Sequence, residues 1–234
     1  MTVDVFADIA CPFCYIGEGR FAEALAEVRS ESPEREVTWR WRPFQLQPGL
    51  PPEGRPWRPF AEQKFGSWER AQAMFERVEQ MGADTGLDFR FDRLEKAFNT
   101  ADAHRLVLWA GEGKQSGGRE RQRAVAEALF AAYFTEGRDV GDPDVLAAVA
   151  GEAGLDADAA RGMLASDRFA DAVTESQEEA RRRGVTGVPL YVFGGENGSE
   201  NGGQNDSAAR AVSGAQPVEV FRQALTGGEQ QAGS

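Results

Sequence analysis

Both cysteines of this 234-residue chain lie in one short stretch, Cys11-Pro12-Phe13-Cys14. Two thiols at this spacing are typical of a dithiol that exchanges disulfides, and they also occur as half of a zinc site. Structural zinc takes four ligands, whereas the chain offers two cysteines and one histidine. The stretch therefore favours redox chemistry and no metal site, with two inert buried thiols as the remaining alternative.

The sequence around this stretch predicts a strand that leads into a helix. Residues 2–6 alternate as in a strand, and residues 13–29 have helical spacing. Cys11 would lie at the helix N-terminus, where the helix dipole and the free N–H groups favour a thiolate. Cys14, one turn later and more buried, would attack Cys11 to resolve a mixed disulfide. The exposed positions of this helix are expected to include Glu18, Glu23 and Glu27.

The order of the remaining elements predicts an α/β fold in which helices interrupt a sheet. Residues 36–44 alternate as a second strand, which a βαβ connection makes parallel to the first. Residues 47–59 are rich in proline and glycine and are expected to form a loop or linker. The later elements are helices over 67–81, 100–110, 119–135, 143–153, 156–164 and 167–183, strands over 188–193 and 210–213, and a final helix over 217–225.

This order, βαβ followed by helices and then ββα, brings the two ends of the chain into one domain. We predict a domain made of residues 1–50 and 184–234, with residues 51–183 as an all-helical insert. Residues 194–207 are polar and are expected to form an enlarged hairpin tip without chemistry.

The composition argues against several classes of function. With a net charge of −12, the chain lacks the basic surface on which nucleic-acid binding depends. No segment approaches the roughly 20 apolar residues that span a bilayer, and the N-terminus shows no signal peptide. We therefore expect a cytoplasmic protein, in a compartment where structural disulfides rarely persist. This expectation favours a catalytic role for the cysteine pair.

Three motifs along the chain resemble a known family. With the order of elements, they resemble the DsbA-type thioredoxin fold, and within it the FrnE-like branch, which is related to 2-hydroxychromene-2-carboxylate isomerases. The resemblance implies an α/β thioredoxin-like fold with a large all-helical insertion, and the long tip over residues 194–207 departs from it. The motifs are Asp8-Ile9-Ala10-Cys11-Pro12-Phe13-Cys14-Tyr15-Ile16-Gly17, Asn99-Thr100-x-x-Ala103-His104-Arg105-Leu106 and Val212-Ser213-Gly214-Ala215-Gln216-Pro217.

The resemblance also implies further residues at the active site. Pro189 would be the cis-proline that faces the cysteines, and Val188 would present its backbone to a bound peptide. An ordinary edge-strand proline is the alternative for Pro189. Pro12 and Phe13, which do not titrate, would tune the thiol pair by shape and contact the substrate.

A second group of residues would reach over the active site from the helical insert, namely Asn99, Thr100 and His104. There a His104 imidazolium would stabilise the Cys11 thiolate or contact substrate. The alternative for His104 is a partly buried imidazole with a structural role.

Two other features are expected to have structural roles. Asp8 precedes the cysteines, and we expect it to cap the helix or face solvent rather than to transfer protons. Trp39 and Trp41 lie on one face of the second strand and are expected in the core.

These observations predict a thiol–disulfide oxidoreductase or disulfide isomerase that works through a mixed disulfide. Its partners would be protein or small-molecule thiols and disulfides, with glutathione as a possible co-substrate, no tightly bound cofactor, and a monomeric or homodimeric state. One alternative is a glutathione-dependent isomerase of the 2-hydroxychromene-2-carboxylate type, although those enzymes use a serine where this chain has Cys11. The other is a redox-inactive chaperone that binds peptides between two lobes.

Overall fold

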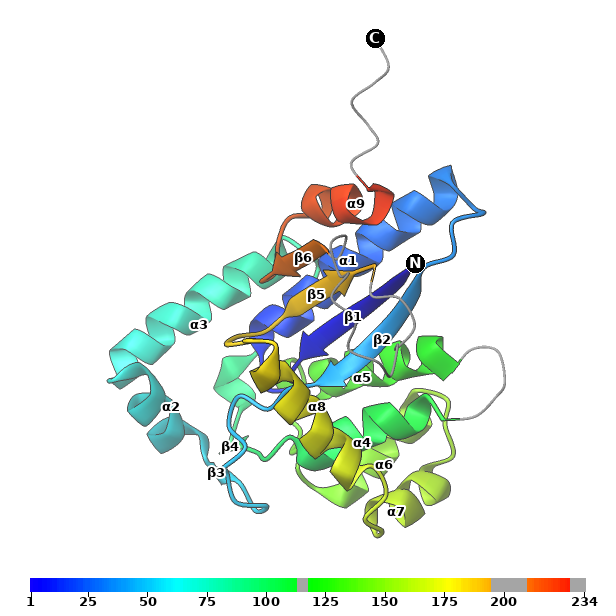
Figure 1. Ribbon diagram of the computed structural model, residues 1–234. Coiled ribbons are helices and arrows are strands. Elements are labelled where there is room, and N and C mark those ends of the chain that lie inside the picture. Colours follow the sequence, from blue (N-terminus) through cyan, green and yellow to red (C-terminus); the bar gives the residue numbers. More distant parts are fainter. Residues whose placement is uncertain (113–117, 195–209, 228–234) are drawn as a thin grey trace.

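A four-stranded mixed sheet lies at the centre of the protein, in a computed structural model that describes residues 1–112, 118–194 and 210–227 (Figure 1). Its strand order is β2-β1-β5-β6, with β1 parallel to β2 and antiparallel to β5. The predicted βαβ and ββα halves therefore meet between β1 and β5. The strands are β1 (Thr2–Ala7), β2 (Thr38–Pro43), β5 (Leu190–Phe193) and β6 (Arg210–Ser213).

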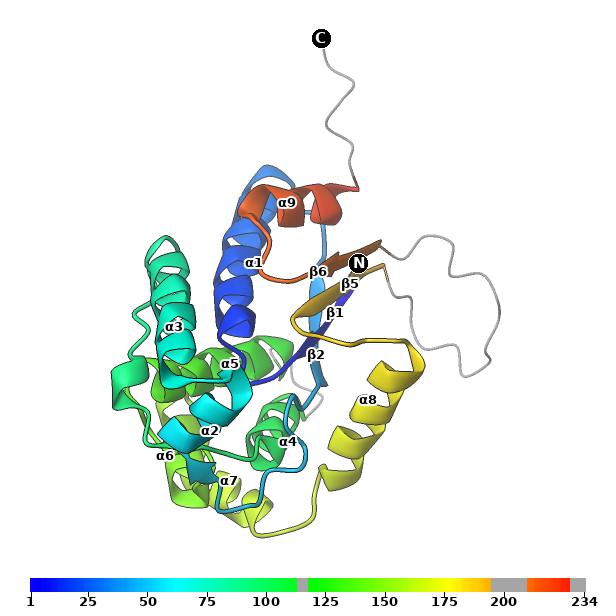
Figure 2. The same cartoon turned by 90° about the vertical axis from the view of Figure 1, so that its left-hand side faces the viewer.

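Helices cover both faces of this sheet. Figure 2 shows α1 (Pro12–Glu31) and α9 (Val218–Thr226) on one face and α8 (Ala170–Arg182) on the other. The remaining helices form the insert between β2 and α8. They are α2 (Trp57–Phe65), α3 (Trp68–Ala83), η1 (Phe91–Arg93), α4 (Ala101–Ala110), α5 (Gly118–Phe134), α6 (Pro143–Glu152) and α7 (Ala157–Leu164), with a two-residue pair of strands, β3 (Arg55–Pro56) and β4 (Lys96–Ala97).

The side chains of β1 alternate between two different environments because successive residues in a strand point to opposite faces. Val3 and Val5 join the core on the α1 face, where the cysteines lie. Phe6 packs instead with Ala180 of α8. Asp4, next to Val5, points to the α8 face as well, where its carboxylate accepts hydrogen bonds from two arginines of β2, Arg40 and Arg42.

The active-site helix α1 is joined to the helical insert by aromatic stacking. Tyr15, the residue after Cys14, stacks on Phe130 of α5 with ring centroids 5.2 Å apart. It also meets Phe89 edge-on at 5.5 Å. Such contacts hold the start of α1 between the sheet and the insert.

The first helix of the insert begins within the loop that we predicted. Helix α2 begins at Trp57, so the predicted loop over 47–59 is wrong at its end: Pro56 is the N-cap and Pro59 lies in the first turn, where a proline costs no hydrogen bond. The domain boundaries stay a prediction, and α8, which we placed in the insert, packs against β2 through a Ser176 hydroxyl that donates to the Pro43 carbonyl at 2.9 Å. The predicted hairpin tip over 194–207 lies outside the described residues except for Gly194.

None of the described helices combines the length and apolar character that a membrane span requires. Trp39 and Trp41 are buried, as predicted.

The closest fit between α1 and the sheet is at Gly17. A Cβ at this position would lie 2.8 Å from the Tyr191 hydroxyl and 3.2 Å from Pro189 Cγ. We expect Gly17→Ala to lower the free energy of unfolding by about 1–3 kcal/mol, because a fully buried tyrosine would have to move. Urea unfolding followed by tryptophan fluorescence measures this change.

Gly19→Ala is the matched control in the same helix. A Cβ there would meet only Leu87 Cδ1, at an ordinary 3.9 Å. The control should therefore gain about 0.5–1 kcal/mol from the lost flexibility of glycine. Equal stability of the two variants would contradict the close fit at Gly17.

Candidate active site

The two cysteines lie together at the start of α1. Cys11 is the N-cap, with extended backbone angles, and Pro12 begins the helix. The Cys14 amide donates to the Cys11 carbonyl at 3.0 Å, which folds the stretch into the first turn. Both residues are free thiols and both are buried, Cys11 at 4% and Cys14 at 2% exposure. The pair thus has the predicted strand-to-helix position.

The two thiols differ in their surroundings. Cys11 Sγ points at the carbonyl oxygen of Val188, 3.6 Å away. Burial, and then the neighbouring Cys11, raise the pKa of the Cys14 thiol well above its usual value. Cys14 therefore keeps its proton at neutral pH unless another group takes it.

A loop from the other half of the fold faces the pair. The Val188–Pro189 peptide bond, for which we expected the cis form, is cis. Its position just before β5 sets the Val188 carbonyl against Cys11. Tyr191, two residues on, stacks on Phe21 of α1 with ring centroids 5.4 Å apart. The predicted residues Val188 and Pro189 thus lie beside the thiols.

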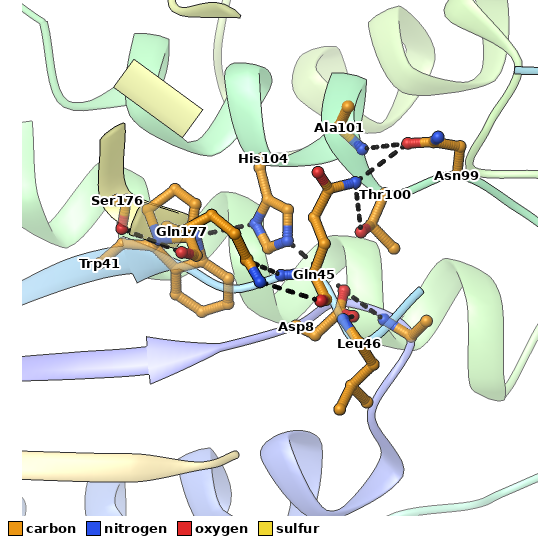
Figure 3. Close-up of polar contacts among 12 residues, drawn as sticks. Asp8, Trp41, Gln45, Leu46, Asn99, Thr100, Ala101, His104, Ser176 and Gln177 are labelled. Carbon is orange, nitrogen blue, oxygen red and sulfur yellow. Dashed lines mark hydrogen bonds and ion pairs between the residues drawn. The ribbon is translucent and has the colours of Figure 1, made fainter. Parts of the chain in front are cut away.

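Asp8 lies at the end of β1, and its exposure was predicted wrongly: the residue is 1% exposed. Its Oδ2 accepts from the Leu46 amide at 2.7 Å, as Figure 3 shows. Its Oδ1 accepts from the Ala10 amide at 3.3 Å. These bonds tie the turn before Cys11 to the chain that leaves β2.

His104 lies between Asp8 and Trp41 and is fully buried (Figure 3). Its Nδ1 accepts a hydrogen bond from Trp41 Nε1 at 3.1 Å. Since an indole N–H can only donate, the ring carries its proton on Nε2. Nε2 lies 3.4 Å from Asp8 Oδ1 but does not form a hydrogen bond with it. His104 is thus part of a buried polar cluster with Trp41 and Asp8, and its predicted effect on Cys11 or on a substrate stays a prediction.

Asn99 and Thr100 form hydrogen bonds just before α4. The Asn99 side chain accepts from Gln45 Nε2 and from the Ala101 amide, each at 3.0 Å. Thr100 Oγ1 lies 3.4 Å from the same Gln45 nitrogen. Contact between these side chains and a substrate stays a prediction.

An apolar cavity of about 170 Å³ opens beside Cys11. Pro12, Phe13 and Thr100 line it together with Cys11, so four of the predicted residues meet here. Lys64, an exposed cation of α2, also lines it. The insert supplies most of the wall through Trp57, Phe60, Phe65, Phe75, Phe91 and Phe98.

Glu18 is the functional candidate that the sequence reasoning missed, because we placed it on the exposed side of α1. Its side chain is 3% exposed, and its Oε1 accepts from Arg123 Nε of α5 at 2.6 Å. The signal in the sequence was its spacing, four residues after Cys14 and three before Phe21, which is that of one buried helix stripe.

Among the described residues, no three His, Cys, Asp or Glu side chains are grouped so that they could hold a metal ion.

Comparison with known proteins supports this description of the fold. The model of the DSBA-like thioredoxin domain matches residues 2–226. The probable DsbA oxidoreductase SCO1869 from Streptomyces coelicolor is 35% identical, with a TM-score of 0.79 over 100% of this chain and 93% of that one. The uncharacterized protein YwbO of Bacillus subtilis is 26% identical over 82% of this chain and 86% of its own length.

A more distant structure shares the fold. The cytosolic disulfide reductase DsbM from Pseudomonas aeruginosa is 18% identical, with a TM-score of 0.65 over 99% of this chain and 100% of that one. Its structure has also been solved with GSH.

The hydrogen bond between Trp41 and His104 can be tested directly, because the chain has one histidine. We expect nitrogen NMR of the imidazole to show an Nε2–H tautomer at neutral pH. Trp41→Phe should change this signature and lower the free energy of unfolding by about 1–3 kcal/mol, since Nδ1 loses its buried donor.

Trp39→Phe is the control on the same strand face. The indole N–H of Trp39 does not bond His104, so this change alters the same strand face and leaves the bond between Trp41 and His104 in place. It should leave the imidazole signature unchanged. A proton on Nδ1 in the wild-type protein would contradict the arrangement.

Proposed function

We propose that this chain, which belongs to the DSBA-like thioredoxin domain family, is a thiol–disulfide oxidoreductase or isomerase that works through Cys11 and Cys14. The observation that carries the proposal is the pair of free thiols at the start of α1, with Cys11 against the carbonyl of Val188. A thiol at a helix N-terminus is favoured as a thiolate, which is the form that attacks disulfides.

The reaction has two exchange steps. The Cys11 thiolate attacks one sulfur of a substrate disulfide, and the other sulfur leaves as a thiolate with the electron pair. Cys14 then attacks Cys11 and releases the first substrate sulfur. The substrate is reduced and the Cys11–Cys14 pair is oxidised; the reverse sequence oxidises a substrate dithiol.

The surroundings of Cys11 suit a substrate with an apolar group next to its reacting sulfur. The cavity beside Cys11 has mostly apolar walls, to which Pro12, Phe13 and Thr100 contribute. An extended peptide would lie along Val188 and Pro189 and pair with the backbone there. In this proposal the thiols belong to the domain made of residues 1–50 and 184–234. The insert of residues 51–183 supplies most of the cavity wall.

Glutathione is a suitable small thiol to recycle the pair, and no tightly bound cofactor is required. The support is the fold shared with DsbM, which has been solved with GSH. DsbM is a cytosolic disulfide reductase, which agrees with the cytoplasmic location that we propose here.

Serine substitutions of the two cysteines test the proposal. Cys11→Ser should abolish insulin reduction and the refolding of a scrambled disulfide substrate, because the attacking sulfur is gone. Cys14→Ser should leave the first attack intact and accumulate a mixed disulfide, visible on non-reducing gels. Wild-type rates in Cys11→Ser would contradict the proposal.

The same variants separate the two alternative functions. A redox-inactive chaperone would keep its suppression of aggregation when both cysteines are serine. A glutathione-dependent isomerase would change the absorbance of a chromene carboxylate in the presence of glutathione and would not need Cys14.

A further inference from the structure

A buried carboxylate that the reaction above does not use lies one turn beyond Cys14. Glu18 is 2% exposed and accepts a hydrogen bond from Arg123 of α5 at 2.6 Å. Burial raises the pKa of Glu18 to about 7, against the opposing effect of the Arg123 charge. Near neutral pH the carboxyl is therefore present in both forms, as a group that takes up and returns protons must be.

The spacing on α1 places Glu18 on the same face as Cys14. Side chains four residues apart in a helix lie on one face as neighbours, and both of these are buried. Tyr191 of β5 lies against this part of the helix, since a Cβ on the intervening Gly17 would be 2.8 Å from its hydroxyl. That hydroxyl is buried and has no hydrogen-bond partner among the described residues.

The charges of Glu18 and of the two cysteines all affect the pKa of the Tyr191 hydroxyl. Burial raises its pKa well above the usual value, and the charges of Glu18, Cys14 and Cys11, in that order, raise it further. The charges of the carboxylate and of the thiols therefore act on one unpartnered hydroxyl, which packs against α1 at Gly17. A neutral hydroxyl that can both donate and accept is the type of group that relays a proton.

The resolving step creates the need for such a relay. Cys14 must lose its proton before it attacks, although burial opposes its ionisation. Asp8 is a second carboxylate near Cys14, but its two oxygens already accept from the backbone amides of Ala10 and Leu46.

We propose that Glu18 is the internal proton acceptor for Cys14, with the Tyr191 hydroxyl as the relay between them. The proposal rests on the function proposed above. In the mixed disulfide, the Cys14 thiol gives its proton to the Tyr191 oxygen while the Tyr191 hydroxyl proton passes to the Glu18 carboxylate. The Cys14 thiolate attacks Cys11 Sγ, the Cys11–Cys14 bond forms, and the substrate sulfur leaves with the electron pair.

A charged residue of α5 connects Glu18 with the surface of the protein. From α5, Arg123 contacts Glu18 and Glu127 at once, and its side chain is 25% exposed. From β2, the Trp39 indole faces the Glu18 carboxylate and favours its charged form, as Arg123 does, whereas the Glu127 charge opposes it. The carboxyl thus lies between the buried thiol and a charged group that reaches the surface.

Release of a coloured thiolate measures the resolving step directly. The reduced full-length protein is mixed with dithiobis(nitrobenzoate): Cys11 releases one nitrobenzoate thiolate, and Cys14 releases the second in a first-order phase. In the wild type, the rate of this second phase should rise with pH through an inflection near 7. In Glu18→Gln the inflection should be lost and the phase slowed by about a hundredfold just above neutral pH, with the first phase unchanged.

The direction of the change separates proton transfer from a purely electrostatic effect. If Glu18 acted only through its charge, its removal would favour the Cys14 thiolate and speed the second phase. Tyr191→Phe keeps the ring and removes the relay, so it should slow the second phase as Glu18→Gln does. Urea unfolding shows whether each variant is folded. If Glu18→Gln does not fold, Tyr191→Phe alone tests the proposal.

Glu127→Gln is the matched control, because it removes the other carboxylate that contacts Arg123, at 2.8 Å, from a half-exposed position. It should keep the second phase and its inflection, which moves only to lower pH because the Glu127 charge no longer raises the pKa of Glu18. An unchanged or faster second phase in Glu18→Gln overturns the proposal, as does an inflection that disappears only in Asp8→Asn. A wild-type protein that releases a single thiolate would instead refute the proposed dithiol function itself.

Discussion

Burial of a dithiol is the physical constraint on which the rest of this structure depends. Thiol exchange needs a sulfur that gains and loses charge, yet Cys14 lies where water does not solvate it. The protein has to replace water with fixed polar groups. Cys11 lies at the N-terminus of α1 and faces the Val188 carbonyl. The Glu18 carboxylate lies further along the same helix, and the Tyr191 hydroxyl of β5 packs against this helix at Gly17.

The sheet keeps two kinds of charged group apart. On the α8 face, Asp4 is paired with Arg40 and Arg42, and this net attraction lowers its pKa despite its burial. On the α1 face, Glu18 is paired with one guanidinium among the described residues, that of Arg123, and desolvation by burial raises its pKa instead. Both carboxylates are buried, so the number and position of their cationic neighbours decide which one stays ionised and which one can exchange a proton.

The parts of the site that were predictable from sequence are those set by local pattern. The cysteine pair and the strand before it are recognised from neighbouring residues, whereas the cis-proline before β5 was expected only from the resemblance to a known family. The burial of Glu18 and Asp8 was not, because it depends on partners brought from far along the chain: Arg123 lies 105 residues after Glu18, and the Leu46 amide 38 residues after Asp8. The first three residues of α2 were placed in the predicted loop because prolines that begin a helix look like those that prevent one.

The fit between Gly17 and Tyr191 also restricts how the family's sequences can change. The tyrosine hydroxyl occupies the space that any larger residue at position 17 would need. Substitution of Tyr191 by phenylalanine removes that nearest atom and leaves Pro189 Cγ, at 3.2 Å, as the next obstacle. We therefore expect the two positions to be coupled, so that a side chain at position 17 costs less stability once the hydroxyl at position 191 is gone.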